Sequence, residues 1–171
     1  SVLKSGDKII FIGNSYTYYG KCVLDKGQTE LGLIKRVNDR GYFYQVCKAN
    51  GLDVKVTNFT FGGHQLKDFY SGKCAAGRGH DGLNHLEYLT DRDYDYVVLQ
   101  QGSGGKDSAD ILSECRLLMD LFLKVNPDTK FVLFHGSYPW MDDFCGLAVH
   151  GGRPVAVLGD GGVQDTAAVA G

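Results

Sequence analysis

A serine that follows a short apolar run near the start of the chain has the setting of a nucleophile. Residues 9–12 read Ile-Ile-Phe-Ile, and Gly13, Asn14 and Ser15 come next. The run predicts a strand buried on both faces, and glycine makes a turn easy where the strand stops. In an open α/β sheet, ligands and chemistry gather at the carboxyl ends of the strands, so Ser15 could attack a carbonyl there while backbone N–H groups hold the oxyanion. The alternative is a Ser or Asn that only caps a helix.

Two later segments bring more candidate residues to predicted strand ends. Residues 52–61 alternate β-forming side chains and are followed by Gly62 and Gly63. Residues 95–100 contain an apolar run and end at Gln100, which Gln101 follows. A glycine lets the backbone approach a substrate closely, and a Gln side chain carries an amide donor.

Helical patterns separate these predicted strands. They cover residues 29–50, 64–71 and, most clearly, 111–123, where apolar side chains recur at helical spacing. A fourth strand is predicted at residues 131–135. Strands alternating with helices imply a mostly parallel sheet with right-handed crossovers and helices on both faces. The sequence therefore predicts a three-layer α/β/α domain over residues 1–145.

The last part of the chain differs in composition. Residues 146–171 are mostly Gly, Ala, Val and Asp, with little periodicity. We expect a short strand at 155–158 and a helix at 166–170 within this tail. The abrupt change fits either a poorly ordered end or a stretch that is not native.

Charge and hydropathy exclude several function classes. The 171 residues include 18 Lys and Arg against 20 Asp and Glu, a formal net charge of -2. Because these charges are scattered, we expect neither a nucleic-acid partner nor a membrane partner. No apolar run approaches the roughly 18–20 residues that cross a bilayer. The composition is that of a soluble globular domain, whose oligomeric state stays open.

The cysteines number five and contain no C-x-x-C pair. This pattern favours buried free thiols over a zinc site or a disulfide framework, and with them a reducing, cytoplasmic compartment. No signal peptide is visible, but secretion stays open because the chain begins at Ser1 and not at a methionine. His80 and His85 match no tight ligand spacing, so we expect no metal and no cofactor.

Three motifs, in this order, resemble sequence blocks of the SGNH (GDSL-type) hydrolases. Residues 10–17, Ile-Phe-Ile-Gly-Asn-Ser-Tyr-Thr, resemble the first block in a variant with Gly-Asn-Ser in place of Gly-Asp-Ser. Thr60-Phe61-Gly62-Gly63 resembles the second block, and residues 95–103, Asp-Tyr-Val-Val-Leu-Gln-Gln-Gly-Ser, lie where the family has its oxyanion-hole amide. The resemblance covers about residues 8–140 and implies a flavodoxin-like SGNH-hydrolase fold.

The resemblance implies a role for each matched residue. Ser15 would be the nucleophile, and the N–H groups of Ser15 and Gly63 (or, less well, Gly62) would hold the oxyanion. The family's third donor is usually an Asn side chain, which is absent here. Some carbohydrate esterases of the superfamily have a Gln-Gly pair at this point, which favours Gln101 over Gln100. The alternative is a Gln that only bonds the loop backbone.

The general base is the largest departure from the family pattern. The family supplies it from an Asp-x-x-His element, and none of the five histidines of this chain has an Asp three places before it. His135, at the end of the fourth predicted strand, and His150, in the tail, are candidate substitutes. His64 should also lie near the same edge. Each of the three also fits an ordinary bonded or exposed histidine.

The resulting expectation is a serine esterase that hydrolyses an acyl ester, such as an acetyl group on a carbohydrate. Asn14, Tyr16, His64 and Trp140 are the expected substrate contacts, with aromatic faces for a sugar ring. The first alternative is a catalytically impaired binding domain on the same scaffold, because the Asp-x-x-His is missing. The second is a flavodoxin-like binder of an anion or nucleotide, although neither glycine-rich phosphate motif is present.

Overall fold

The computed structural model describes residues 3–18, 35–36, 41–60, 62–70, 93–101 and 108–134, and the strand segments 149–150, 153–154, 156–159 and 162–164. Within these residues, seven strands form one sheet in the order β2-β3-β1-β4-β5-β8-β9. A separate pair consists of β6 (Val149–His150) and β7 (Arg153–Pro154). The strands of the main sheet are β1 (Lys8–Gly13), β2 (Lys35–Arg36), β3 (Lys55–Thr60), β4 (Tyr96–Gln100), β5 (Lys130–Phe134), β8 (Ala156–Gly159) and β9 (Gly162–Gln164). The helices are α1 (Ser15–Tyr18), α2 (Gly41–Ala49), α3 (Leu66–Tyr70) and α5 (Ser108–Val125).

The central strands are parallel, and their order reverses beside β1. β1 pairs in parallel with β3 on one side and with β4 on the other, β4 pairs in parallel with β5, and β5 with β8. Among the described strands of this sheet, β2 and β9 alone run antiparallel to their neighbours. The junction of β1 and β4 is therefore a topological switch point, where open α/β sheets bind ligands beyond the carboxyl ends of their strands.

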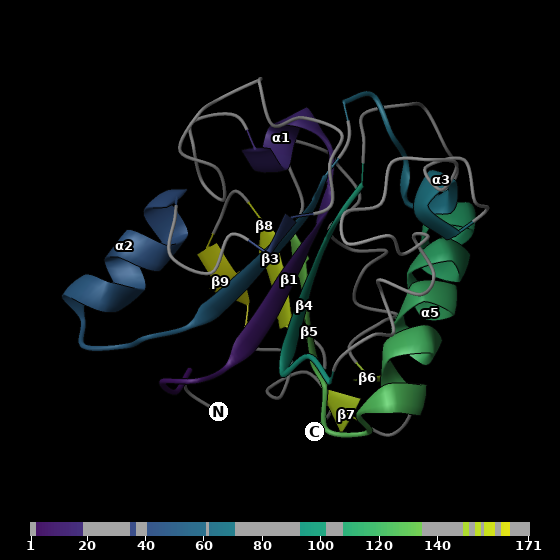
Figure 1. Cartoon of the computed structure of the whole chain (residues 1–171). Coiled ribbons are helices and arrows are strands. Elements are labelled where there is room, and N and C mark those ends of the chain that lie inside the picture. Colours follow the sequence, from purple (N-terminus) through teal and green to yellow (C-terminus); the bar gives the residue numbers. More distant parts are fainter. Residues whose placement is uncertain are drawn as a thin grey trace.

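Helices cover both faces of this sheet, which confirms the three-layer α/β/α prediction. In Figure 1, α2 lies on one side of the sheet, and α3 and α5 lie on the other. Side chains of β1 alternate between the two layers: Ile10 and Ile12 join the core with α3 and α5, whereas Ile9 and Phe11 join the core with α2. Burial on both faces explains why this strand is an unbroken apolar run and not an alternating one.

Most predicted elements are confirmed, and one is wrong. The strands predicted at 52–61, 95–100 and 131–135 correspond to β3, β4 and β5, and the helix predicted at 64–71 corresponds to α3. The helix predicted at 29–50 begins only at Gly41, and Lys35–Arg36 form β2, antiparallel to β3. Gly41 has a φ of 81°, outside the helical range, so the helix cannot continue through it. Backbone pairing with β3 outweighs the helical spacing that the sequence shows at 35–36.

The tail contributes to the sheet. The strand predicted at 155–158 is confirmed as β8, which pairs in parallel with β5 through Val132 and Ala156 at one end and Phe134 and Leu158 at the other. The helix predicted at 166–170 lies outside the described residues, and the boundary at residue 145 stays a prediction. Among the described helices, none is long and apolar enough to cross a membrane.

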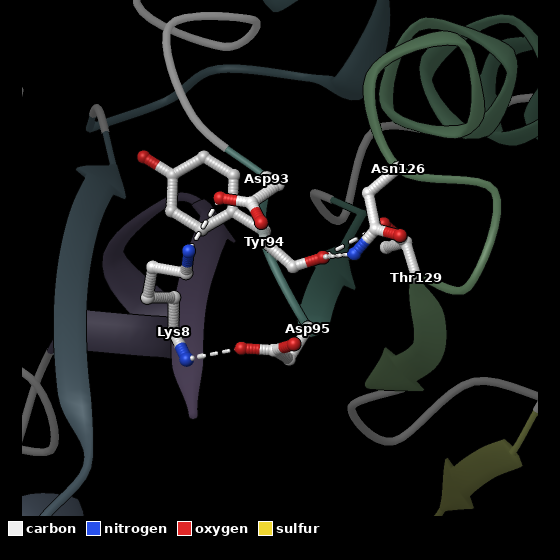
Figure 2. A network of polar contacts seen from close by, with 6 residues as sticks. All are labelled: Lys8, Asp93, Tyr94, Asp95, Asn126 and Thr129. Atoms are coloured by element: carbon white, nitrogen blue, oxygen red, sulfur yellow. Dashed lines mark hydrogen bonds and ion pairs between the residues drawn. The ribbon is translucent and has the colours of Figure 1, made fainter. Parts of the chain in front are cut away.

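A polar network joins the amino-terminal ends of the strands, at the edge opposite Ser15 (Figure 2). The Lys8 N–H donates to the Asp95 carboxylate at 2.8 Å, and the Asp95 N–H donates to the Lys8 carbonyl at 2.8 Å. The Tyr94 carbonyl accepts from the Thr129 hydroxyl at 2.7 Å and from the Asn126 amide at 3.1 Å. An exposed ion pair between Lys8 and Asp93 adds about 1 kcal/mol at most. The network aligns β1 with β4 and anchors the end of α5 to β4.

Two described cysteines are buried free thiols, as the sequence predicts for this residue type: Cys47 on α2 and Cys115 on α5. Burial raises the pKa of both thiols. The pKa of Cys115 rises from 9.0 to about 12, mainly through burial and also through the nearby Glu114 carboxylate, whereas Arg116 lowers it. Folding therefore favours the protonated thiol.

We expect Cys115 to make the protein less stable in alkali. Below pH 9 the thiol is protonated in both states, so its contribution to stability is fully present there. As the pH rises from 9.0 toward about 12, the unfolded chain loses the proton first and the free energy of unfolding falls. Urea denaturation across this range should show a steeper decline for the natural chain than for Cys115→Ala, whose cavity lowers stability at every pH alike. Equal pH slopes in the two proteins would contradict this assignment.

Candidate active site

The end of β1 leads directly into the short helix α1 (Figure 1). Asn14 is the single residue between them, since β1 ends at Gly13 and α1 begins at Ser15. Asn14 is 3% exposed, and its side-chain oxygen accepts the Tyr16 N–H at 3.1 Å. The Thr17 N–H donates to the Asn14 carbonyl at 2.9 Å. This is the geometry of a helix N-cap, so the capping alternative considered for this stretch is correct for Asn14.

Ser15 is the first residue of α1 and is half-buried at the carboxyl end of β1. In the described stretch 14–17, the N–H groups of Asn14, Tyr16 and Thr17 have the acceptors Gln100 Oε1, Asn14 Oδ1 and the Asn14 carbonyl. The Ser15 N–H is at the first helical position, where a helix provides no carbonyl one turn earlier. The arrangement therefore places a serine hydroxyl and its own N–H together at the switch point of the sheet.

Gln100, at the end of β4, binds the turn that carries Ser15. Its side chain is 1% exposed, and its Oε1 accepts both the Asn14 N–H at 2.9 Å and the Thr17 hydroxyl at 2.9 Å. Its Nε2 donates to the carbonyl of Gln101. Since Gln100 is so deeply buried and its amide is bonded at both ends, it is poorly placed to touch a substrate.

Gly13 is required for this close approach. A Cβ atom at Gly13 would lie 2.5 Å from Thr17 Oγ1 and 2.6 Å from Gln100 Oε1, distances that real Cβ contacts do not reach. Gly13 is not among the described glycines with positive φ, so the turn does not need glycine for its backbone angles. The sequence predicts that Gly13 eases a turn, whereas in the structure Gly13 leaves space for the side chains of Thr17 and Gln100.

The loop after β3 is held by Gln101. The Leu66 N–H donates to Gln101 Oε1 at 2.8 Å, and Gln101 Nε2 donates to Gln65 Oε1 at 2.6 Å. The Gln65 N–H donates to the buried Asp68 carboxylate at 2.9 Å, which satisfies another group at the start of α3. Gly63 in the same loop is exposed, with a φ of 69° that only glycine adopts easily.

His64 connects this loop to the nucleophile turn. The Asn14 Nδ2 donates to the His64 carbonyl at 2.9 Å, so the two loops are joined beside Ser15. The His64 Nδ1 lies 2.9 Å from the Gly62 carbonyl, and its ring packs on Phe69 with 5.9 Å between centroids. Since a carbonyl only accepts, Nδ1 carries the proton and the Nε2 of a neutral ring is an acceptor.

The structure brings most of the predicted site residues to one edge of the sheet. Asn14, Tyr16, Gly63, His64, Gln100 and Gln101 lie on the turn after β1, the loop after β3 and the end of β4. Tyr16 is 55% exposed beside Ser15. His135 and Trp140 lie outside the described residues, and of His150 only its place in β6 is described.

Two residues of this edge were not among the candidates that the sequence predicts. Thr17 binds Gln100, and Gln65 binds Gln101. Thr17 lies within the first motif, but a side chain that bonds another side chain from a distant strand leaves no local signal.

In the described part of the chain, no group of three or more His, Cys, Asp or Glu side chains could hold a metal ion.

Comparison with known proteins finds similarity at the level of structure. No protein-family model matches the sequence, and no curated protein matches it either. A carbohydrate esterase family 2 enzyme with a carbohydrate-binding domain, from Corynascus thermopiles (Myceliophthora fergusii), has a TM-score of 0.47 and 16% identity over 79% of this chain and 46% of its own. A putative GDSL-like lipase from Parabacteroides merdae has a TM-score of 0.49 and 19% identity, over 84% of this chain and 71% of its own.

A catalytic mutant of an acetylxylan esterase from Geobacillus stearothermophilus has a TM-score of 0.47 and 18% identity, over 78% of this chain and 62% of its own. The chain thus spans less than half of the first of these proteins and under two thirds of the third. At such low identity and TM-score the likeness carries nothing about substrate or mechanism. The chain is similar in structure to a GDSL-like lipase, a family 2 carbohydrate esterase and an acetylxylan esterase, and its three sequence motifs resemble the SGNH superfamily.

Proposed function

We propose that this chain is a serine esterase of the SGNH type, with Ser15 as its nucleophile. The observation that carries the proposal is the arrangement of N–H groups after β1. Those of Asn14, Tyr16 and Thr17 donate to Gln100 or Asn14. The Ser15 N–H belongs to the first helical turn, which supplies no intrahelical acceptor, and within the described stretch 14–17 it has none of these other acceptors. A hydroxyl next to an N–H of this kind is what acyl transfer needs for attack and for oxyanion stabilisation.

The reaction would proceed in two acyl-transfer steps. Ser15 Oγ attacks the ester carbonyl and gives its proton to a base. The negative oxygen of the resulting tetrahedral intermediate accepts hydrogen bonds from the N–H groups of Ser15 and Gly63. Collapse of the intermediate expels the alcohol, which takes the proton, and leaves an acyl group on Ser15. Water then attacks the acyl-enzyme, releases the acid and restores the hydroxyl.

The third oxyanion donor we propose is the side chain of Gln101. One N–H of its Nε2 bonds Gln65, and the amide has a second N–H. Gln101 is half-buried, unlike Gln100, so its amide is the more accessible of the two. This supports the preference for Gln101 that the sequence suggests.

The base we propose is a histidine. His64 is a candidate because it lies beside the Ser15 turn and its Nδ1 bonds a backbone carbonyl, which orients the ring. His135 and His150 remain candidates from their positions in the sequence. A backbone carbonyl in the place of the usual carboxylate would stabilise the charged imidazolium less, so a modest rate is expected.

The substrate class we propose is an acyl ester, such as an acetyl group, on a carbohydrate. Tyr16 adjoins the nucleophile and is 55% exposed, so its ring offers a flat apolar face of the kind that sugar rings stack on. Trp140 is proposed as a second aromatic contact.

A serine-reactive probe tests the proposal directly. A fluorophosphonate should modify the folded chain at one residue, and peptide mapping by mass spectrometry should identify that residue as Ser15. The same chain unfolded in urea should not react, because the donors and the base are then dispersed. Modification of another residue, or equal labelling of the folded and unfolded chain, would contradict the proposed nucleophile.

A second candidate function is an impaired binding domain on the same scaffold. It is favoured by a specific observation, the lack of Asp three places before any of the five histidines. An acetylated oligosaccharide would then bind, as measured by calorimetry, with neither release of acetate nor probe labelling at Ser15. Hydrolysis that depends on Ser15 would exclude this function.

A further inference from the structure

We infer that Gln100 is a positioning residue, which holds the start of α1 so that the Ser15 N–H is the group left to face the oxyanion. The inference rests on the proposed function. It gives Gln100 a role in positioning the nucleophile turn, in place of the role of oxyanion donor that the sequence had suggested for it. Its basis is the contact set of one buried amide. Oε1 accepts from the Asn14 backbone and the Thr17 hydroxyl, and Nε2 donates to the Gln101 carbonyl.

The position of Gln100 in the sheet makes these contacts possible. β4 pairs in parallel with β1, with Leu99 opposite Ile12, so the next residue of β4 lies beside the turn that leaves β1. Gly13 has no side chain there, and a Cβ atom would come within 2.6 Å of Gln100 Oε1. The amide therefore reaches across from one strand to the backbone that immediately precedes Ser15.

The orientation of the amide is determined by its own donor. Because Nε2 bonds the Gln101 carbonyl, Oε1 must point toward Asn14 and Thr17, which both offer donors. The Asn14 N–H and the Thr17 hydroxyl are buried together with the Gln100 amide, since Asn14 and Thr17 are 3% and 6% exposed. Water cannot easily replace a bond at this depth, so loss of the amide leaves buried donors unsatisfied and the turn free to rotate.

Gln100 and Gln101 thus hold two different loops. Gln100 binds the turn with Ser15, and Gln101 binds the loop with Gly63 through Leu66 and Gln65. Asn14 joins the two through the His64 carbonyl. The relative position of the two proposed backbone donors is consequently determined by side chains at the end of β4. An error of about 1 Å in such a site can lower the rate about 100-fold.

The test uses three substitutions that disturb the contacts in different ways. Gln100→Met removes the amide, Thr17→Val removes one donor to it with little change of shape, and Gly13→Ala displaces both partners without removing any polar group. We expect kcat for p-nitrophenyl acetate to fall about 100-fold in Gln100→Met and about 10-fold in the other two, with KM nearly unchanged. Thr17→Ser keeps the hydroxyl and should restore most of kcat.

Thermal melts of each variant separate misfolding from misplacement. If Gln100→Met does not fold, the inference is tested by comparing kcat of Thr17→Val, which lacks the hydroxyl, with kcat of Thr17→Ser, which keeps it. Wild-type kcat in folded Thr17→Val and Gly13→Ala would overturn the inference, as would a loss in Thr17→Ser equal to that in Thr17→Val.

Amide exchange distinguishes failure of this inference from failure of the proposed function. The Asn14 N–H should exchange slowly in the natural chain and much faster in Gln100→Met or Thr17→Val, whereas amides of β3 are unchanged. If the natural chain shows no Ser15-dependent hydrolysis, the proposed function fails, and the Asn14 exchange rate alone then tests the holding role. Equal Asn14 exchange in the natural and variant chains would overturn that role whatever the activity.

Discussion

Replacing Ser15 by alanine is expected to abolish ester hydrolysis while leaving the fold intact. Ser15 is half-buried at the first position of a helix, where alanine is well tolerated, so the melting temperature should change little. Without the hydroxyl no acyl-enzyme can form, and kcat for p-nitrophenyl acetate should fall by about 1,000-fold or more, or to the buffer rate if the natural chain is a slow enzyme.

Ser113→Ala is the matched control for this substitution. Ser113 is an exposed serine of α5, outside the turn that carries Ser15 and the loop that carries Gly63. It should therefore keep the full rate. Comparable hydrolysis by Ser15→Ala and the natural chain would remove Ser15 as the nucleophile and leave the binding-domain alternative or another site.

Replacing Gly63 by alanine is expected to lower kcat about 100-fold, the loss typical of one oxyanion donor. Gly63 has a φ of 69°, a backbone angle that costs an alanine roughly 1–2 kcal/mol. There is open space where the Cβ would lie, so the effect comes from the backbone and not from a clash. A backbone that relaxes toward negative φ turns the Gly63 N–H away from the oxyanion. Because that N–H is proposed to act mainly in the transition state, kcat should fall and KM should stay nearly constant.

Gly51→Ala provides a control with the same intrinsic strain. Gly51 has a φ of 78°, also with open space at its Cβ position, and it follows α2 at the opposite edge of the sheet. Urea denaturation should show a similar loss of stability in both variants. Only Gly63→Ala should lose activity, and an equal loss in the two would show that Gly63 acts through stability and not as a donor.

The strands and their ends can be predicted from the sequence because their causes are local. A strand buried on both faces must be apolar throughout, so residues 9–12 indicate β1 without any knowledge of the fold. In the same way, the apolar run of the strand predicted at 95–100 indicates β4 (Tyr96–Gln100). The helix predicted at 29–50 fails because its first part is an edge strand, and the partner of that strand, β3, is distant in the sequence. Periodicity reports which face is apolar, not which backbone groups a neighbour offers.

The roles of the polar residues at the site depended on tertiary structure. Sequence alone predicted Ser15, Gly63 and the pair Gln100 and Gln101 as a group, because each lies at or just after the end of a predicted strand. It favoured Gln101 over Gln100 only through the family resemblance, because the two glutamines have the same chemistry and differ in which loop each one contacts. It predicted Asn14 as a substrate contact, whereas the geometry, with its amide bonded to Tyr16 and His64, favours a positioning role.

The sequence by itself determined that a serine follows closely after an apolar strand, and that helices separate the strands of one sheet. Why the strand ends in glycine was decided by the tertiary structure, because the space that Gly13 leaves is filled by the side chains of Thr17 and Gln100. Only the tertiary structure decided that β4 lies directly beside β1, although residues 14–95 separate the end of β1 at Gly13 from the start of β4 at Tyr96. That adjacency is what brings the Gln100 amide to the Asn14 N–H. The physical reason is that burial acts on each residue separately and is visible in composition, whereas a hydrogen bond needs two groups whose meeting is decided by the path of the whole chain.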